Sequence, residues 1–101
     1  MSQPGRLWVR LFKHHRVERD AVIPCMREDV EEALRDLLPT LDLSQPTWLP
    51  RHRADWDEYS LTRFRPEHFM ESVDFDYMEI SYIFPEDEKR QARRRHVLED
   101  V

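Results

Sequence analysis

Residues 7 to 12 have the sequence Leu7-Trp8-Val9-Arg10-Leu11-Phe12. Successive side chains of a strand point to opposite faces, so the three aliphatic residues share one face and Trp8, Arg10 and Phe12 share the other. Aromatic and β-branched residues favour strands. Because both faces are largely apolar, the pattern indicates a central strand with a neighbour on each side.

Two further segments are expected to pair with this one. Residues 17–23 follow after only four residues, which predicts a β-hairpin whose second, more polar strand lies nearer an edge. Residues 77–84 also alternate, and Pro85 ends them because proline cannot donate to a strand ladder. One face of this third strand carries Met78, Ile80, Tyr82 and Phe84.

Residues 28–38 change to a helical period. Their apolar positions, spaced three and four apart, form one stripe of Val30, Ala33, Leu34, Leu37 and Leu38. The acidic first turn suits the helix dipole, and Pro39 ends the helix. Shorter helical segments are expected from Pro50 to Tyr59 and from Pro66 to Met70.

These segments fit together in one arrangement, with the 7–12 strand central and antiparallel to both neighbours. We therefore expect an α+β domain over residues 1–85, followed by a charged, flexible tail over residues 86–101. The domain would hold a three-stranded antiparallel sheet, in the order 2-1-3 along the chain, with one main helix on its inner face. The second face needs a cover, either residues 48–69 or a partner, and we favour coverage by the chain itself.

The composition excludes several classes of site. Gly5 is the only glycine and Cys25 the only cysteine. Phosphate-binding loops and the nucleophile elbow need several glycines or small residues, and an intramolecular disulfide or a paired-cysteine zinc motif needs more cysteines. The run after Arg6 contains Arg10 instead of an apolar signal region, and no stretch approaches 18 apolar residues. We expect a cytoplasmic protein that does not span a membrane and binds no cofactor.

Side chains capable of chemistry are present but scattered. The five histidines are His14, His15, His52, His68 and His96, and none follows a metal-binding spacing, so no metal site is expected. A small enzyme using His68, Glu67, His52 or Cys25 is one alternative function, although only residue types favour it. We favour structural roles, with His68 bonded to a backbone carbonyl and Cys25 unreactive.

Several motifs resemble those of a family of small bacterial proteins with no assigned function. They are Pro46-Thr47-Trp48-Leu49, Trp56-Asp57-Glu58-Tyr59, Thr62-Arg63-Phe64, Pro66-Glu67-His68-Phe69 and Val73-Asp74-Phe75-Asp76-Tyr77-Met78-Glu79-Ile80. The likeness extends to the 7–12 strand and to Val22-Ile23-Pro24-Cys25. The resemblance implies a bacterial cytoplasmic protein and brings no catalytic residue or ligand.

The first functional hypothesis is a non-enzymatic protein-interaction or regulatory module. Trp, Tyr and Arg are common anchors of protein interfaces. The candidate partner surface comprises Trp8, Arg10, Phe12, Trp48, Tyr77 and Glu79. The partner would be an unidentified protein or, in a homodimer, a second copy of the chain.

An alternative is nucleic-acid association through the tail. Its basic residues are Lys89, Arg90, Arg93, Arg94 and Arg95. Residues 86–101 contain five basic and five acidic side chains, whereas residues 1–85 contain eleven basic and sixteen acidic ones. An acidic body repels a polyanion, so the sequence favours a solvated tail over a nucleic-acid-binding one.

Overall fold

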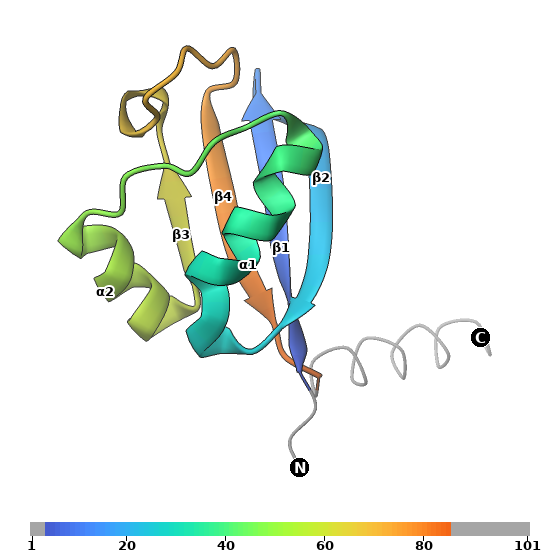
Figure 1. Cartoon of the computed structure of the whole chain (residues 1–101). Coiled ribbons are helices and arrows are strands. Elements are labelled where there is room, and N and C mark those ends of the chain that lie inside the picture. Colours follow the sequence, from blue (N-terminus) through green and yellow to red (C-terminus); the bar gives the residue numbers. More distant parts are fainter. Residues whose placement is uncertain (1–3, 86–101) are drawn as a thin grey trace, which may run out of the picture.

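The structure is a computed structural model that describes residues 4–85, and in these residues one antiparallel sheet supports two helices. The strands are β1 (Gly5–Lys13), β2 (Arg16–Cys25), β3 (Leu61–Phe64) and β4 (Tyr77–Ile83). The helices α1 (Val30–Leu37) and α2 (Pro50–Tyr59) form a second layer on one face of the sheet (Figure 1). The predicted α+β class is confirmed.

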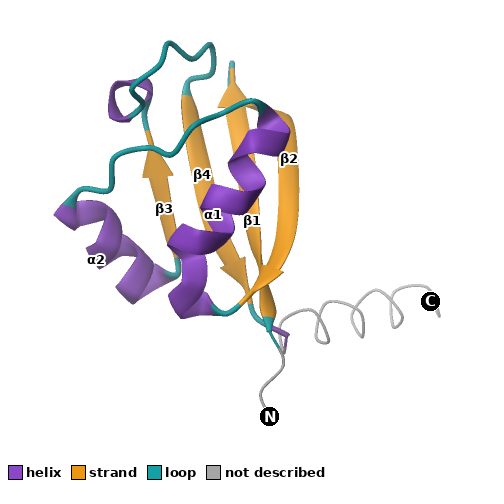
Figure 2. Ribbon diagram, viewed as in Figure 1, coloured by secondary structure: helices purple, strands orange, loops and turns teal. Residues whose placement is uncertain are grey.

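The sheet has four strands in the order β2-β1-β4-β3, so the prediction of three strands in the order 2-1-3 is wrong in its count. The three predicted strands do lie side by side, with β1 antiparallel to β2 and β4. The fourth strand, β3, pairs with β4 at the edge (Figure 2). Its four residues are too few to give a clear alternation, and burial of Thr62 and Phe64 holds it in place.

The hairpin between β1 and β2 turns through two histidines. His14 and His15 have φ values of 52° and 63°, as in the two-residue turns whose twist matches that of paired strands. The carboxylate of Asp76 accepts a hydrogen bond of 2.9 Å from the backbone N–H of His14. The turn lies within the predicted connection 13–16, and Asp76 joins it to the start of β4.

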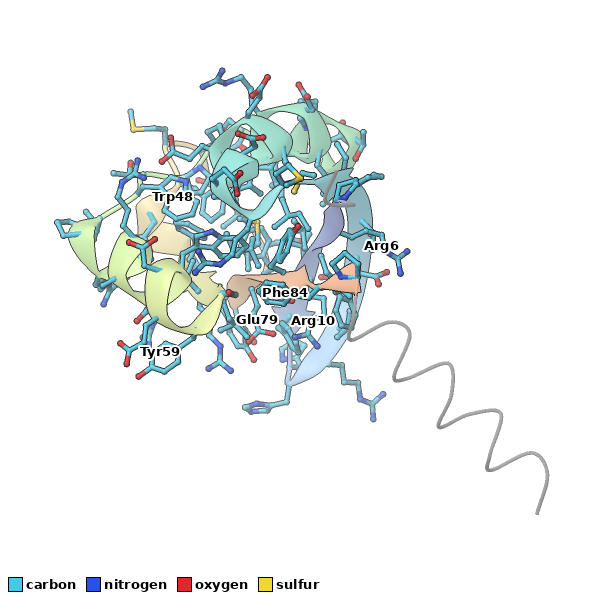
Figure 3. All side chains as sticks on the ribbon, turned by 90° about the horizontal axis from the view of Figure 1, so that it is seen from below. Arg6, Arg10, Trp48, Tyr59, Glu79 and Phe84 are labelled. Carbon is cyan, nitrogen blue, oxygen red and sulfur yellow. The ribbon has the colours of Figure 1, made fainter. Side chains whose placement is uncertain are left out.

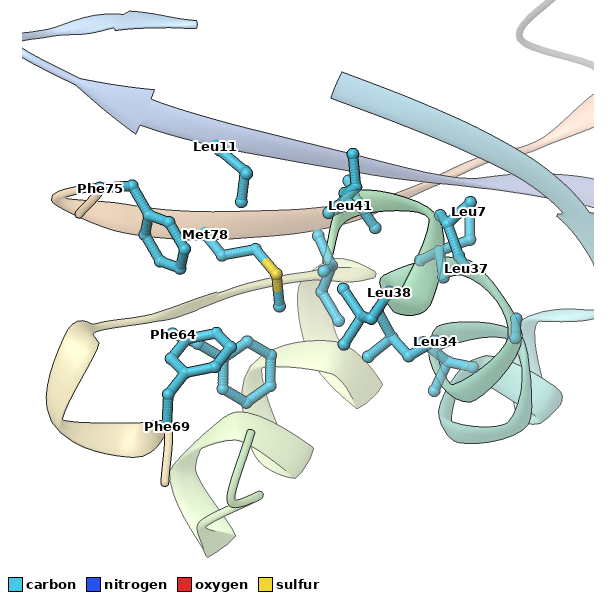
Figure 4. Packing of buried hydrophobic residues seen from close by; sticks show 14 of the residues in the cluster. Leu7, Leu11, Leu34, Leu37, Leu38, Leu41, Phe64, Phe69, Phe75 and Met78 are labelled. Carbon is cyan, nitrogen blue, oxygen red and sulfur yellow. The ribbon is translucent and has the colours of Figure 1, made fainter. Parts of the chain in front are cut away.

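The core lies between α1 and the face of the sheet next to it (Figure 4). Of the predicted inner residues, Tyr82 is half-buried. The others of β1 and β4, and the stripe of α1, are fully or almost fully buried; these are Leu7, Val9, Leu11, Met78, Ile80, Val30, Ala33, Leu34 and Leu37. Phe84 was predicted to join them, but it follows the last residue of β4 and is 39% exposed. After Leu37 the chain continues as a 3-10 turn, Leu38–Leu41, so α1 is shorter than the expected helix 28–38.

Trp48, Trp56 and Phe69 pack in or against the core on the side of α1, and β3 joins the sheet itself, so the expectation that residues 48–69 cover the second face is wrong. Trp48 packs edge-on against Phe64, with ring centroids 5.1 Å apart. Phe64 is opposite Met78, which belongs to the core, and Trp56 is buried in the same cluster. The physical reason is size: an eight-residue helix is only about 12 Å long. The helix α1 therefore covers only part of the inner face of the sheet, and α2 contributes to covering the rest.

One corner of the fold is built around Gly5 and Tyr82. The Tyr82 hydroxyl accepts a hydrogen bond of 2.8 Å from the N–H of Gly5 and donates one of 2.9 Å to the carbonyl of Cys25. A Cβ atom on Gly5 would lie 2.3 Å from the carbonyl oxygen of Ile83 and 2.6 Å from the Tyr82 ring. The only glycine of the chain thus allows β1, β2 and β4 to meet closely.

Candidate functional site

The face of the sheet that points away from both helices is the principal candidate site, and we call it the outer face. Neither α1 nor α2 lies over it, and Arg10 and Glu79 point from it away from the helices (Figure 3). Register pairing places Trp8, Arg10 and Phe12 of β1 opposite Ser81, Glu79 and Tyr77 of β4. The flanking strands add Val22 beside Trp8 and Arg63 beside Glu79.

Glu79 is the centre of a charged cluster on the outer face. It is only 3% exposed, although no described helix covers it. One carboxylate oxygen accepts a hydrogen bond from Arg10, and the other accepts one from Nε of Arg63 at 2.9 Å. The hydrogen bond to Glu79 raises the pKa of the Arg63 guanidinium above its ordinary value. Two guanidinium groups thus compensate a carboxylate that has lost most of its water.

Aromatic rings flank both guanidinium groups. The Arg10 guanidinium lies 4.2 Å from the ring centroid of Trp8 and 5.3 Å from that of Phe12. Phe12 stacks on Tyr77 with a centroid distance of 4.7 Å and an interplanar angle of 16°, and Arg63 lies 5.1 Å above Tyr77. The result is one continuous layer in which rings and guanidinium groups cover one another.

Five of the six residues predicted as a partner surface share this face. They are Trp8, Arg10, Phe12, Tyr77 and Glu79. Trp48 does not join them: it lies on the helix side, against Phe64 and His52 (Figure 3). Arg63 belongs to the cluster and was missed, because the only signal is the alternation in Leu61-Thr62-Arg63-Phe64, which four residues cannot distinguish from a loop.

The two histidines proposed for catalysis, His52 of α2 and His68, lie together in the structure. His52 and His68 are both buried, and their ring centroids are 4.7 Å apart in an edge-to-face arrangement. Glu67 is exposed. The pKa of His52 is lowered, first by burial and then by the charges of His68 and Arg51. His52 is therefore poorly suited to hold a proton, and the exposed Glu67 carboxylate does not belong to the buried cluster of the two histidines.

Each of these two histidines performs the same local task. In Leu49-Pro50-Arg51-His52, Nδ1 of the histidine accepts a hydrogen bond of 2.9 Å from the backbone N–H of Leu49. In Arg65-Pro66-Glu67-His68, Nδ1 accepts one of 2.9 Å from the N–H of Arg65. Both bonds satisfy an amide at the start of a helical turn. His68 therefore bonds a backbone N–H, not the carbonyl that the sequence suggested.

A hollow of about 420 Å³ opens between α2 and β3. Its lining residues are Arg51, His52, Asp55, Tyr59, Leu61, Thr62, Arg63 and Arg65. Arg51 also contacts Nε2 of His68 at 2.9 Å. Arginine is thus the commonest residue in the lining, although the protein carries a net charge of -5.

Cys25 does not have the surroundings of a reactive thiol. Burial is the largest effect and raises its pKa, and the nearby carboxylates of Asp29 and Glu28 act in the same direction. A raised pKa lowers the thiolate fraction, which is the nucleophilic form. The alternative of a small enzyme that uses Cys25 therefore gains no support from the surroundings of this thiol.

Three other predictions concern a metal site, a membrane span and the tail. Within residues 4–85, no cluster of three or more His, Cys, Asp or Glu side chains could hold a metal ion. No helix in the same part of the chain is long and apolar enough to cross a membrane. The predicted nucleic-acid tail (Lys89, Arg90, Arg93, Arg94 and Arg95) and His96 lie outside the described residues.

Comparison of the chain with family models, curated proteins and solved structures gives no match in any of the three. The resemblance to small bacterial proteins therefore stays a prediction. Two surfaces of the described chain are therefore the candidate sites: the outer face and the hollow between α2 and β3.

Proposed function

We propose that this protein is a non-enzymatic protein-binding module whose partner docks on the outer face. The observation that carries the proposal is the grouping of Trp8, Phe12 and Tyr77, all half-buried, on a sheet face over which neither helix lies. Val22, 41% exposed, lies beside Trp8 and extends the apolar area toward the edge of the sheet. Aromatic residues and arginine are enriched at the centres of protein interfaces.

A protein partner suits this face better than a nucleic acid does. In proteins that bind single-stranded nucleic acids, the bases stack on the free faces of aromatic side chains. Here Phe12 and Tyr77 stack on each other, and Arg10 lies over Trp8. The charges are also compensated, since Glu79 pairs with two arginines and Asp20 accepts a hydrogen bond of 3.0 Å from the Trp8 indole. Such a rigid, mixed surface favours a partner with an apolar centre and a polar rim.

Site-specific photocrosslinking tests this proposal. A photoreactive phenylalanine analogue at Ser81, on the outer face, is expected to capture a protein from native lysate. The matched position is Ala54, exposed on α2. Capture from Ala54 but not from Ser81 would place the partner on α2 and contradict the proposal. A product of twice the monomer mass would identify the partner as a second copy, which light scattering at several concentrations would check.

Substitutions provide the second arm of the test. Trp8→Ala and Tyr77→Ala are expected to reduce recovery of the captured protein, whereas Tyr59→Ala is expected to leave it unchanged, because Tyr59 is 67% exposed on α2. Near-ultraviolet circular dichroism would confirm that the variants remain folded. Undiminished recovery of every partner by folded Trp8→Ala and Tyr77→Ala proteins would refute the proposal.

A further inference from the structure

We propose that the hollow between α2 and β3 binds an oxyanion, a phosphate or a carboxylate group, on Arg51 and Arg65. The site lies beside the sheet edge, shares Arg63 with the outer-face cluster, and does not depend on the docking function proposed for that face. Three arginines line the hollow, and Asp55 is the only carboxylate among its lining residues. Guanidinium groups bind both kinds of oxyanion through pairs of parallel N–H donors.

The arginines of the hollow are not equally engaged. Arg63 is held by Glu79 of the outer face. Asp55 has a long hydrogen bond of 3.5 Å from the Thr62 hydroxyl. The guanidinium of Arg65 has no hydrogen bond or ion pair with the other residues described, 4–85, although its backbone N–H does. Positive charge thus exceeds negative charge in this hollow, in a protein that is acidic overall.

The contact between Arg51 and His68 brings two donors together. Nδ1 of His68 accepts the N–H of Arg65, so in the neutral ring Nε2 carries the proton. Nε2 lies 2.9 Å from the Arg51 guanidinium, which has donors only. The other tautomer would merely move the conflict to Nδ1 and the Arg65 amide. His68 is 7% exposed, and such a buried donor calls for an acceptor.

An oxyanion bound to Arg51 in the hollow would place an acceptor next to this pair of donors. His68 itself does not line the hollow, whereas Arg65, which follows β3, does and can bind the same group. The backbone around both arginines is already fixed by Pro50 and Pro66 and by the two histidine-to-amide bonds. Pre-positioned donors lose less conformational freedom on binding, which favours a specific site over diffuse attraction.

The experiment uses the full-length, ¹⁵N-labelled protein at neutral pH. Sodium phosphate and sodium succinate are titrated separately, with sodium chloride holding the ionic strength constant, and amide and arginine Nε–Hε signals are followed by NMR. We expect saturable shifts at Arg51, Thr62 and Arg65. Saturation with phosphate alone would identify a phosphate site, and saturation with succinate alone would identify a carboxylate site.

Matched variants decide whether the shifts report this hollow. Arg51→Gln and Arg65→Gln are each expected to weaken binding by about tenfold or more, as loss of a charged hydrogen bond requires. Arg35→Gln, on the exposed side of α1, should leave it unchanged. Because the Arg65 side chain bonds no described residue, Arg65→Gln should fold normally even if Arg51→Gln does not. Absence of saturable shifts with both anions, or equal binding by Arg65→Gln, would overturn the proposal.

Trp8→Ala distinguishes this proposal from the docking function. The variant alters the outer face and should leave anion binding unchanged, whereas Arg65→Gln should leave partner capture at Ser81 unchanged. In the wild-type protein, capture at Ser81 without anion binding would refute only the oxyanion site. Anion binding without capture would refute only the docking function.

Discussion

The two faces of the sheet are built from the same strands but are stabilised in different ways. On the inner face, Leu7 and Val9 are fully buried beneath α1. On the outer face, their neighbours Trp8 and Arg10 are half-buried, and the Arg10 guanidinium lies over the Trp8 ring. The inner face depends on removal of apolar surface from water, whereas the outer face depends on stacking and ion pairing. Period-two alternation separates the two sets of residues, but it does not say which set the rest of the chain covers.

The largest effect is expected when one phenylalanine is removed from each face. Phe64→Ala should lower the free energy of unfolding by about 3–5 kcal/mol, because Phe64 is fully buried against Trp48 and His52. Phe12→Ala should cost clearly less, since Phe12 is half-buried and packs mainly on Tyr77. Urea unfolding of both variants measures the difference. Equal losses would contradict the contrast between the faces.

A smaller effect is expected from the charged cluster of the outer face. Glu79→Gln should lower the free energy of unfolding by about 1–3 kcal/mol, because it removes the charge that Arg10 and Arg63 share. Much of Arg63 is exposed, so solvent screens part of the loss. Asp20→Asn, a change at an exposed carboxylate on the same side, should stay within about 0.5 kcal/mol of wild type. A loss no larger for Glu79→Gln would show that the burial of Glu79 carries no energetic weight.

The smallest effect is expected in the pH dependence contributed by the inner side. The pKa of His52 in the folded protein lies below its ordinary value of 6.5. The unfolded chain therefore takes up a proton first as the pH falls, and the stability due to neutral His52, full above about pH 7, decreases as the pH falls below 6.5. His52→Gln should flatten this part of the curve of unfolding free energy against pH. His14→Gln, in the exposed hairpin turn, is the control, and an unchanged slope in His52→Gln would contradict the assignment.

The parts of the fold that were predicted correctly have local causes. Alternation in 7–12 and 77–84 gave the two central strands, and the three-and-four spacing from Val30 to Leu37 gave α1. The fourth strand and the position of Trp48 depend instead on contacts between distant segments. Trp48 lies in an irregular stretch without a period, so nothing nearby in the sequence indicates the side of the sheet to which it belongs.

The candidate sites show the same division. Trp8, Arg10, Phe12, Tyr77 and Glu79 could be grouped from strand pairing alone. The hollow could not be, because Arg51 and Arg65 meet only after α2 folds back beside β3. One local signal was nevertheless present. Both arginines belong to four-residue segments with proline second and histidine fourth. In this spacing the imidazole can accept a hydrogen bond from the backbone N–H of the first residue.

The corner at Gly5 brings the two ends of the described residues together. Arg6 is opposite Ile83, so the described residues begin and end side by side, whereas the turn at His14 and His15 lies at the far end of β1 (Figure 1). A short engineered link from Pro85 to Pro4 would close this corner, and the chain could then be opened between the two histidines. Such a circular permutant is expected to keep every strand neighbour, because β1 would stay paired with both β2 and β4.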